Sequence, residues 1–228
     1  MADPVMPTEP TDAERARTIL AAACSLTLTT GDGHRLDCVG LHAVDAASRL
    51  VLLDPADPHL TAELAAAPRS GLAVYAELTD VAPVVVRDRV RARLSLSGRL
   101  TPAGPDTLVL RPARGALTEG DTVRALDAAA LADAAPDPLA TCEAELLSHL
   151  DSGHGDVLPE LAALVAELDL PGVARIRPVR LDRKGLVLRW ERAGEQGDVR
   201  IAFLTEALAP YDVGLRIQEL LDPARTLR

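Results

Sequence analysis

Two histidines, His149 and His154, lie five positions apart in the segment HLDSGHGDV, which runs from residue 149 to residue 157. A neutral imidazole is a good ligand for haem iron or for a metal ion. A neighbouring carboxylate, such as Asp151 or Asp156, could orient either ring. Residues five apart do not share one face of a helix, so we do not expect both rings to reach one ion from a single helix. The alternative is that these side chains cap two helices and hold the turn between them.

Arginines occupy alternate positions along another stretch of the chain, at Arg87, Arg89, Arg91 and Arg93. Alternate side chains of a strand point to the same face, so Arg89 and Arg91 are expected to lie side by side. Guanidinium groups form paired hydrogen bonds with phosphates and carboxylates, and this face could hold a ligand that carries either group. The alternative is a face in contact with water, or the rim of a dimer.

The sequence contains none of the common catalytic or nucleotide-binding motifs. There is no P-loop, no dinucleotide fingerprint, no Gly-x-Ser-x-Gly elbow and no His-Glu-x-x-His, so catalytic residues stay unknown. The cysteines, Cys24, Cys38 and Cys142, are widely spaced and form no Cys-x-x-Cys pair. We expect free thiols rather than a disulfide framework or a structural zinc site, and we predict no metal ligands.

Composition narrows the class of partner. The 228 residues include 34 acidic and 24 basic side chains, a formal net charge of −10, which argues against binding to nucleic acid. Aromatic residues make up 2% of the chain, too few for a platform on which bases could stack. No stretch approaches the length of a membrane span, and the first residues do not resemble a secretory signal. We expect a cytoplasmic protein, and the absence of asparagine together with a single lysine, Lys184, indicates a GC-rich and therefore bacterial genome.

The first half of the chain is expected to form short strands with one inserted helix, after about ten disordered residues. Thr11 and Glu14 form a capping-box pattern that predicts a helix from residue 12. Gly31-Asp32-Gly33 predicts a hairpin turn, and Pro58 suits the first turn of a helix that ends near residue 66. Strands are predicted at about 25–29, 35–44, 50–53, 72–78, 84–100 and from 107, a pattern typical of a small antiparallel barrel.

The second half of the chain has a different pattern. Residues 127–138 are rich in Ala, Asp and Pro and predict a connection between domains. Beyond it we expect two helices, the second with an apolar stripe from Val157 to Leu168, then strands at 173–181, 185–191 and 199–204, and a final helix. The predicted domains are therefore residues 1–126, with the disordered N-terminus, and residues 139–228.

Two segments resemble known families. Residues 24–75, with an Asp32-Gly33 turn and a Pro68-Arg69 pair before the next strand, resemble the FMN-binding split barrel of pyridoxamine 5'-phosphate oxidase-like proteins. The segment 149–157 is similar to the pattern H-M-N-x-D-H-x-D-A in the C-terminal domain of haem-utilisation (HugZ-type) proteins, with Gly153 in place of the acidic residue between the histidines. The resemblance implies an α+β protein in which an antiparallel split β-barrel of the FMN-binding type is followed by a small α+β domain.

The resemblance also implies a homodimer with ligands at the subunit interface, and three functions stay open. The chain could be a haem-binding protein in haem utilisation or degradation, an FMN-dependent oxidoreductase, or a non-catalytic regulator whose protein partner is an enzyme of haem synthesis. The tail DPARTLR lacks the histidine that haem-degrading relatives use, and the helix segment HLTAEL at residues 59–64 departs from the His-Thr-x-Asn-Leu of relatives.

The departure in the helix segment and the low aromatic content weigh against FMN, and the missing tail histidine weighs against haem oxygenase activity. Haem binding is therefore favoured, and enzymatic activity stays open. We expect haem to bind through His149 or His154, with Arg89 and Arg91 as partners of the propionates.

Overall fold

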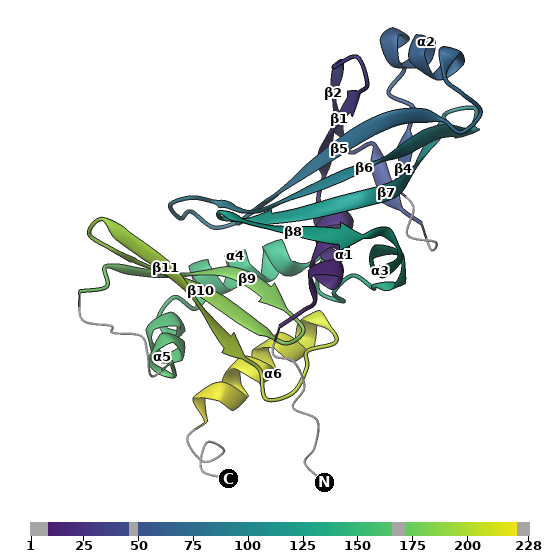
Figure 1. Ribbon diagram of the computed structural model, residues 1–228. Helices are drawn as coiled ribbons and strands as arrows, with labels where there is room; N and C mark the ends of the chain where they lie inside the picture. The colour runs from purple at the N-terminus through teal and green to yellow at the C-terminus, as the bar shows by residue number, and fades with distance from the viewer. Residues whose placement is uncertain (1–8, 46–49, 166–171, 223–228) are drawn as a thin grey trace. The chain divides into compact units, whose positions relative to one another are not determined.

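The computed structural model describes residues 9–45, 50–165 and 172–222, and they form an α+β fold with one eight-stranded and one three-stranded antiparallel sheet (Figure 1). The larger sheet curls into a half-barrel, so the predicted fold class is confirmed. Disorder was expected for about the first ten residues, and residues 1–8 of these lie outside the described ranges. No helix among the described residues is both long enough and apolar enough to cross a membrane.

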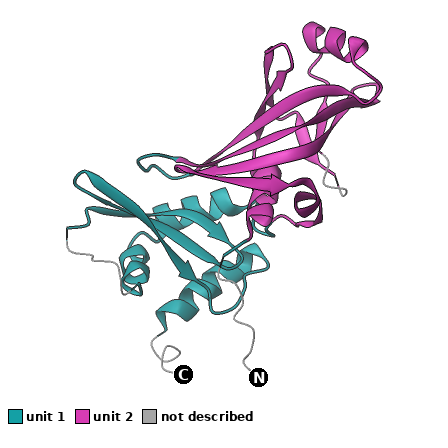
Figure 2. Cartoon of the chain, viewed as in Figure 1, with its two compact units in different colours: residues 1–10, 82–89, 137–228 teal, residues 11–81, 90–136 magenta. Residues whose placement is uncertain are grey.

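The chain divides into two compact units, which are described separately (Figure 2). Unit 1 consists of residues 1–10, 82–89 and 137–228, and unit 2 consists of residues 11–81 and 90–136. Compact units are not necessarily domains that fold alone, so the domain boundaries 1–126 and 139–228 stay a prediction.

The curled sheet belongs to unit 2 and has the order β2-β1-β5-β6-β7-β4-β3, with β8 paired to β7. Buried leucines of these strands alternate with exposed or half-buried residues, as in Leu94, Leu96 and Leu100 of β6, none of which is exposed to solvent. The core is therefore aliphatic, as expected for a chain with so few aromatic residues. The strands are β1 (Ser25–Thr30), β2 (Arg35–Val39), β3 (His42–Val44), β4 (Leu50–Leu53), β5 (Leu72–Val81), β6 (Val90–Gly104), β7 (Thr107–Glu119) and β8 (Thr122–Asp127).

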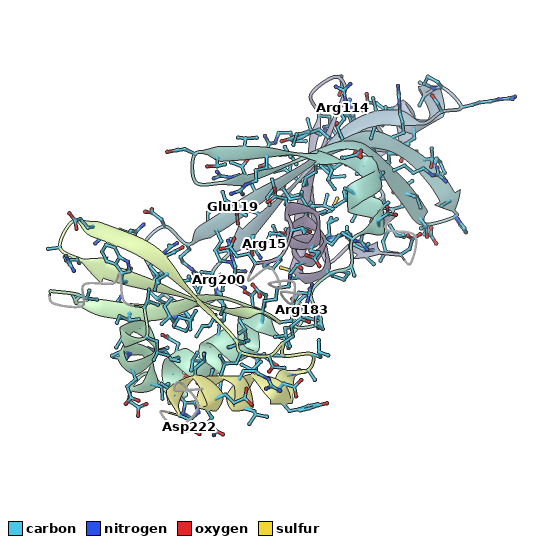
Figure 3. The ribbon with its side chains drawn as sticks, turned by 60° about the horizontal axis from the view of Figure 1, so that its bottom comes forward. Arg15, Arg114, Glu119, Arg183, Arg200 and Asp222 are labelled. Carbon is cyan, nitrogen blue, oxygen red and sulfur yellow. The ribbon has the colours of Figure 1, made fainter. Side chains whose placement is uncertain are left out.

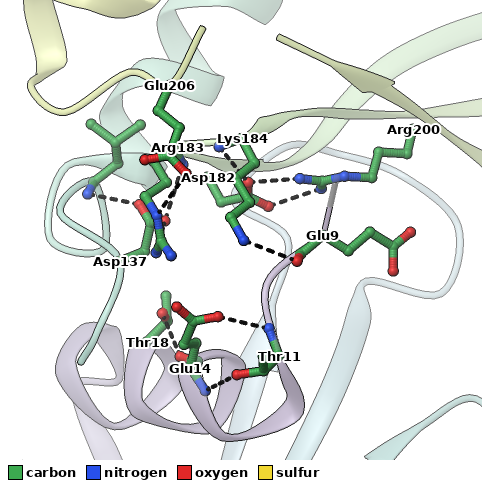
Figure 4. Close-up of polar contacts among 11 residues, drawn as sticks. Glu9, Thr11, Glu14, Thr18, Asp137, Asp182, Arg183, Lys184, Arg200 and Glu206 are labelled. Atoms are coloured by element: carbon green, nitrogen blue, oxygen red, sulfur yellow. Dashed lines mark hydrogen bonds and ion pairs between the residues drawn. The ribbon is translucent and has the colours of Figure 1, made fainter. Parts of the chain in front are cut away.

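Three helices accompany this sheet: α1 (Asp12–Ala22), α2 (Pro58–Ala66) and α3 (Ala128–Asp133). The capping box of α1 is confirmed, because the Glu14 N–H donates to Thr11 Oγ1 at 3.2 Å and the Thr11 N–H donates to Glu14 Oε2 at 2.8 Å (Figure 4). Arg15 of the same helix forms an ion pair with Glu119 of β7, with Arg15 Nε 3.6 Å from Glu119 Oε1 (Figure 3). The helix α3 falls inside the stretch predicted as a connection, so that stretch is partly helical.

The strand predicted over residues 84–100 begins only at Val90. Asp88 has a φ of +52°, a left-handed conformation that a regular strand does not contain, and the Ala82 N–H donates to the Arg89 carbonyl at 2.8 Å to close a loop. The prediction was wrong because Val84 and Val86 alternate like strand residues but belong to the core of unit 1. The strand predicted over residues 35–44 is also interrupted, at Gly40, whose φ is +67°.

Unit 1 is built on the sheet β11-β10-β9, formed by β9 (Arg175–Asp182), β10 (Gly185–Arg192) and β11 (Glu195–Ala202). The helices are α4 (Glu143–Gly153), α5 (Val157–Ala163) and α6 (Pro210–Leu221), and both α4 and α5 pack against β9. The predicted helix around residues 157–168 ends at Ala163, and Leu168 lies outside the described residues.

A buried carboxylate, that of Asp137, stabilises a connection between elements of unit 1. Asp137, which is 5% exposed, accepts hydrogen bonds from the N–H groups of Leu139 at 2.9 Å and Arg183 at 3.0 Å (Figure 4). The chain entering α4 is thereby tied to the turn between β9 and β10. Burial raises the pKa of Asp137 even though both N–H groups favour its charged form.

Candidate functional site

The two histidines of the sequence motif face each other at the C-terminal end of α4. The Nε2 atoms of His149 and His154 are 3.2 Å apart, and the ring centroids are 4.9 Å apart with an interplanar angle of 78°. The two rings meet although residues five apart do not share one face of a helix, because only His149 lies within α4. Whether they bind one ion together stays a prediction. His154 is the C-cap, with φ −138° and ψ 34°, so the chain has left the helix and turns the ring back toward His149.

This contact requires complementary hydrogen-bonding roles of the two rings. A single proton can lie between two Nε2 atoms, so one ring donates and the other accepts. Both residues are exposed, and the Nε2 that accepts this hydrogen bond could offer the same lone pair to an external ligand once the contact opens. The pair is therefore a ready source of an imidazole donor at the protein surface.

The aspartates of the motif do not hold the imidazole rings. Asp151 forms an ion pair with Arg177 of β9, and the hydrogen bond from Arg177 to this carboxylate is the main cause of the raised pKa of Arg177. Asp156 occupies the N-cap position of α5 but makes no side-chain capping bond there. The Asp151–Arg177 pair therefore anchors the last turn of α4 to the sheet.

A surface hollow of about 560 Å³ lies beside the motif, between the end of α4, α5 and the start of β9. Asp151 and Gly155, which lie three positions before and one position after His154 in the chain, are part of its wall. Apolar side chains and two arginines complete the lining, which consists of Asp151, Gly155, Leu158, Pro159, Val173, Ala174, Arg175, Ile176 and Arg177. The hollow thus combines apolar walls with cations.

Arg175 and Arg177 escaped the sequence analysis, although the signal was present. They alternate in the segment RIRPVR at 175–180 just as the arginines at 87–93 do. Arg175 is the more available of the two, because its side chain is 46% exposed and its Nη1 lies 4.0 Å from the carboxylate of Glu191.

Arg89 and Arg91, predicted to act together, are engaged separately. Arg89 donates through Nε and Nη2 to the Ala82 carbonyl, at 3.1 and 2.8 Å, within unit 1. Arg91 belongs to unit 2, where its side chain is 6% exposed and its Nε donates to Asp80 at 3.0 Å. The role of both arginines in cofactor binding stays a prediction. A haem propionate would have to displace the carboxylate of Asp80 to reach Arg91.

Comparison with known proteins identifies a structural relative. No protein-family model and no curated protein matches the chain. A solved haem-binding protein from Mycobacterium smegmatis covers 96% of this chain and 99% of its own length, with a TM-score of 0.62 and 21% sequence identity. The two chains share a fold.

That likeness supports the split-barrel expectation at the level of architecture. A protein of unknown function from Agrobacterium tumefaciens covers 97% of this chain and all of its own length, but its TM-score of 0.35 and identity of 15% carry no argument. Membership of the FMN-binding or HugZ-type family stays a prediction.

Proposed function

We propose that the chain binds haem, with His149 or His154 as the axial ligand. The observation that carries this proposal is the exposed imidazole pair, with its Nε2 atoms 3.2 Å apart, next to the hollow of about 560 Å³. Haem requires an axial donor, apolar contact for the porphyrin and cations for its propionates. The residues of unit 1 offer all three.

The lining of the hollow supports haem as the ligand, although His149 and His154 lie beside the hollow and are not part of its lining. Leu158 and Ile176 provide apolar walls, and Arg175 provides an exposed guanidinium. We assign a propionate first to Arg175, because Arg91 is already paired with Asp80 and Arg177 with Asp151. The haem-binding protein of the same fold from Mycobacterium smegmatis adds support for haem as the ligand class.

Bound haem would supply an iron centre for ligand binding or redox chemistry. The chain's own contribution would be the imidazole, the guanidinium and the partial exclusion of water from the porphyrin faces. A role in haem utilisation or degradation stays a prediction. The two alternative functions, an FMN-dependent oxidoreductase and a regulator of a haem-synthesis enzyme, also stay predictions.

The test is a titration of the purified protein with ferric haem, followed by the Soret absorbance. We expect His149→Ala and His154→Ala to identify the ligand, because one of them should shift the Soret maximum and weaken binding at least tenfold. The double variant should lose specific binding. His59→Ala, an exposed histidine of unit 2, is the matched control and should leave the spectrum unchanged.

Two results would overturn the proposal. One is a wild-type spectrum identical to that of free haem, and the other is a double variant with unchanged spectrum and affinity. A parallel titration with FMN, read by flavin fluorescence, separates the remaining alternatives. Stoichiometric quenching would favour the oxidoreductase, and the absence of both ligands would favour the regulator.

A further inference from the structure

A second cluster of chemically active side chains lies in unit 2, where the turn between β1 and β2 meets the N-terminal part of α2. The turn contributes Asp32 and His34, and the helix contributes Asp57, His59 and Glu63. The cluster brings together two imidazoles and three carboxylates from parts of the chain separated by more than twenty residues. It is distinct from the proposed haem site, which lies in unit 1.

Three of these residues direct ligand atoms toward one point. His59 Nε2 lies 2.7 Å from Asp32 Oδ2 and 3.8 Å from Glu63 Oε2. One atom from each of the three residues falls within 4.8 Å of the others. Within the part of the chain that the structure describes, Glu63 Oε2 is buried and accepts no hydrogen bond. A single imidazole nitrogen therefore faces two carboxylates and can satisfy only one of them.

The carboxylate of Asp32 is held in place by its other oxygen. Oδ1 accepts hydrogen bonds from the Thr30 hydroxyl at 2.5 Å and from the His34 N–H at 3.1 Å. Oδ2 is thus presented to His59 by a carboxylate that is already oriented. Such anchoring of a ligand through its second atom is typical of metal sites.

The remaining two residues support the same arrangement. The rings of His34 and His59 are in contact, with centroids 4.3 Å apart and an interplanar angle of 38°, and His34 Nε2 lies 3.2 Å from Asp57 Oδ1. The same Asp57 oxygen accepts the Leu60 N–H at 2.7 Å as the N-cap of α2. The ring of His34, held by Asp57, therefore limits how far the His59 ring can rotate toward it.

We propose that Asp32, His59 and Glu63 bind a divalent transition-metal ion, with zinc as the ion that the ligand set suits best. Zinc accepts imidazole nitrogen and carboxylate oxygen at about 2.0–2.2 Å, so its ligand atoms lie about 3.4 Å apart in a tetrahedral site. The observed separations lie on both sides of this spacing, at 2.7 Å and 3.8 Å from His59 Nε2, and all three atoms lie within 4.8 Å of one another. Asp32 and His59 are about half exposed, which leaves a fourth position for water.

The ion would connect two elements that are far apart in sequence. Asp32 and His59 are 27 positions apart, and a shared ligand would fasten the β1–β2 turn to α2. Because the folded chain alone presents the three ligands together, zinc should stabilise it against unfolding. This proposal is independent of haem binding.

The experiment uses the full chain carrying His149→Ala and His154→Ala, so that the histidine pair of unit 1 cannot contribute ligands. After treatment with a chelator, the protein is titrated with Zn²⁺ by calorimetry and with Co²⁺ by visible absorbance. We expect one Zn²⁺ per chain, intense four-coordinate Co²⁺ bands and a raised unfolding temperature. Adding His59→Ala, Asp32→Asn or Glu63→Gln should weaken Zn²⁺ binding at least tenfold.

Asp106→Asn is the matched control, because Asp106 is an exposed aspartate in the turn between β6 and β7 of the same unit. It should leave the affinity and the Co²⁺ bands unchanged, and circular dichroism should show every variant folded. The proposal is overturned if the parent variant binds no Zn²⁺, or if none of the three ligand substitutions weakens binding. Neither result would bear on the Soret titration, so the two proposals fail separately.

Discussion

The backbone N–H of Leu181 in β9 donates a 3.0 Å hydrogen bond to Oε1 of Glu143 in the first turn of α4, and both residues are buried. This bond joins the helix that carries the histidine pair to the strand that lines the hollow. A carboxylate 5% exposed to solvent requires such partners, because removing a charge from water is costly. The geometry of the candidate haem site therefore depends on a contact at the opposite end of α4.

Glu143→Ala is expected to destabilise the protein by about 2 kcal/mol, because it leaves the buried Leu181 N–H without its acceptor. Urea unfolding followed by circular dichroism measures the loss. Glu145→Ala is the control, since Glu145 occupies the same helical turn but is exposed and should change the free energy of unfolding by less than about 0.5 kcal/mol. Equal effects of the two substitutions would contradict the role of the Leu181 contact.

The Asp151–Arg177 ion pair is expected to hold the end of α4 more strongly than a surface pair would. The two side chains are 15% and 29% exposed, so a double-mutant cycle with Asp151→Asn and Arg177→Met should give a coupling of about 1 kcal/mol. The comparison cycle is Arg175–Glu191, whose charged atoms lie 4.0 Å apart and whose arginine is 46% exposed. That cycle should give a coupling near zero, and the reverse order of the two couplings would refute the prediction.

Gly98→Ala is expected to destabilise the curled sheet by about 3 kcal/mol. A Cβ at Gly98 would lie 2.1 Å from the Arg111 carbonyl oxygen, and the clash is with backbone that cannot rotate away. Gly104→Ala is the matched control on the same strand, because its Cβ would meet nothing closer than 3.7 Å, in Thr107. Thermal unfolding measures the loss of stability in each variant. Equal losses in Gly98→Ala and Gly104→Ala would contradict the close contact between Gly98 and Arg111.

His42 is expected to make the stability of the protein depend on pH below about 6.5. Burial lowers the pKa of His42 below its ordinary value of 6.5, and the backbone of Ala23 offsets this only in part. The unfolded chain therefore takes up a proton before the folded chain does, so stability falls as the pH drops through 6.5 and is constant above it with respect to this group. Urea midpoints between pH 8 and pH 5.5 should fall less steeply in His42→Gln than in the wild type.

We propose that the protein is a homodimer. Light scattering at micromolar concentration should give twice the chain mass of 24.0 kDa. A monomer mass under the same conditions would remove this proposal and leave the haem and zinc proposals intact, because the residues of each site come from one chain.

Local features of this protein were predictable from the sequence, because they depend on neighbouring residues. The Thr11–Glu14 capping box, the hairpin at Asp32-Gly33 and the Pro58 start of α2 each involve groups within a few positions of one another. The succession of short strands likewise predicted an antiparallel sheet, which the structure contains. Even so, the strand predicted from residue 84 failed at Asp88, where the backbone adopts a positive φ that no pattern of apolar residues reveals.

The partners of the charged side chains were decided only by the tertiary structure. From the sequence, the carboxylate of Asp151 could orient one of the histidine rings. In the fold it is paired with Arg177 instead, 26 positions away. The fold also brings His59 to Asp32 across 27 positions, where no spacing rule applies. Ion pairs and ligand clusters depend on which strand and helix ends meet, and that is fixed by the packing of the whole unit rather than by the residues of any one segment.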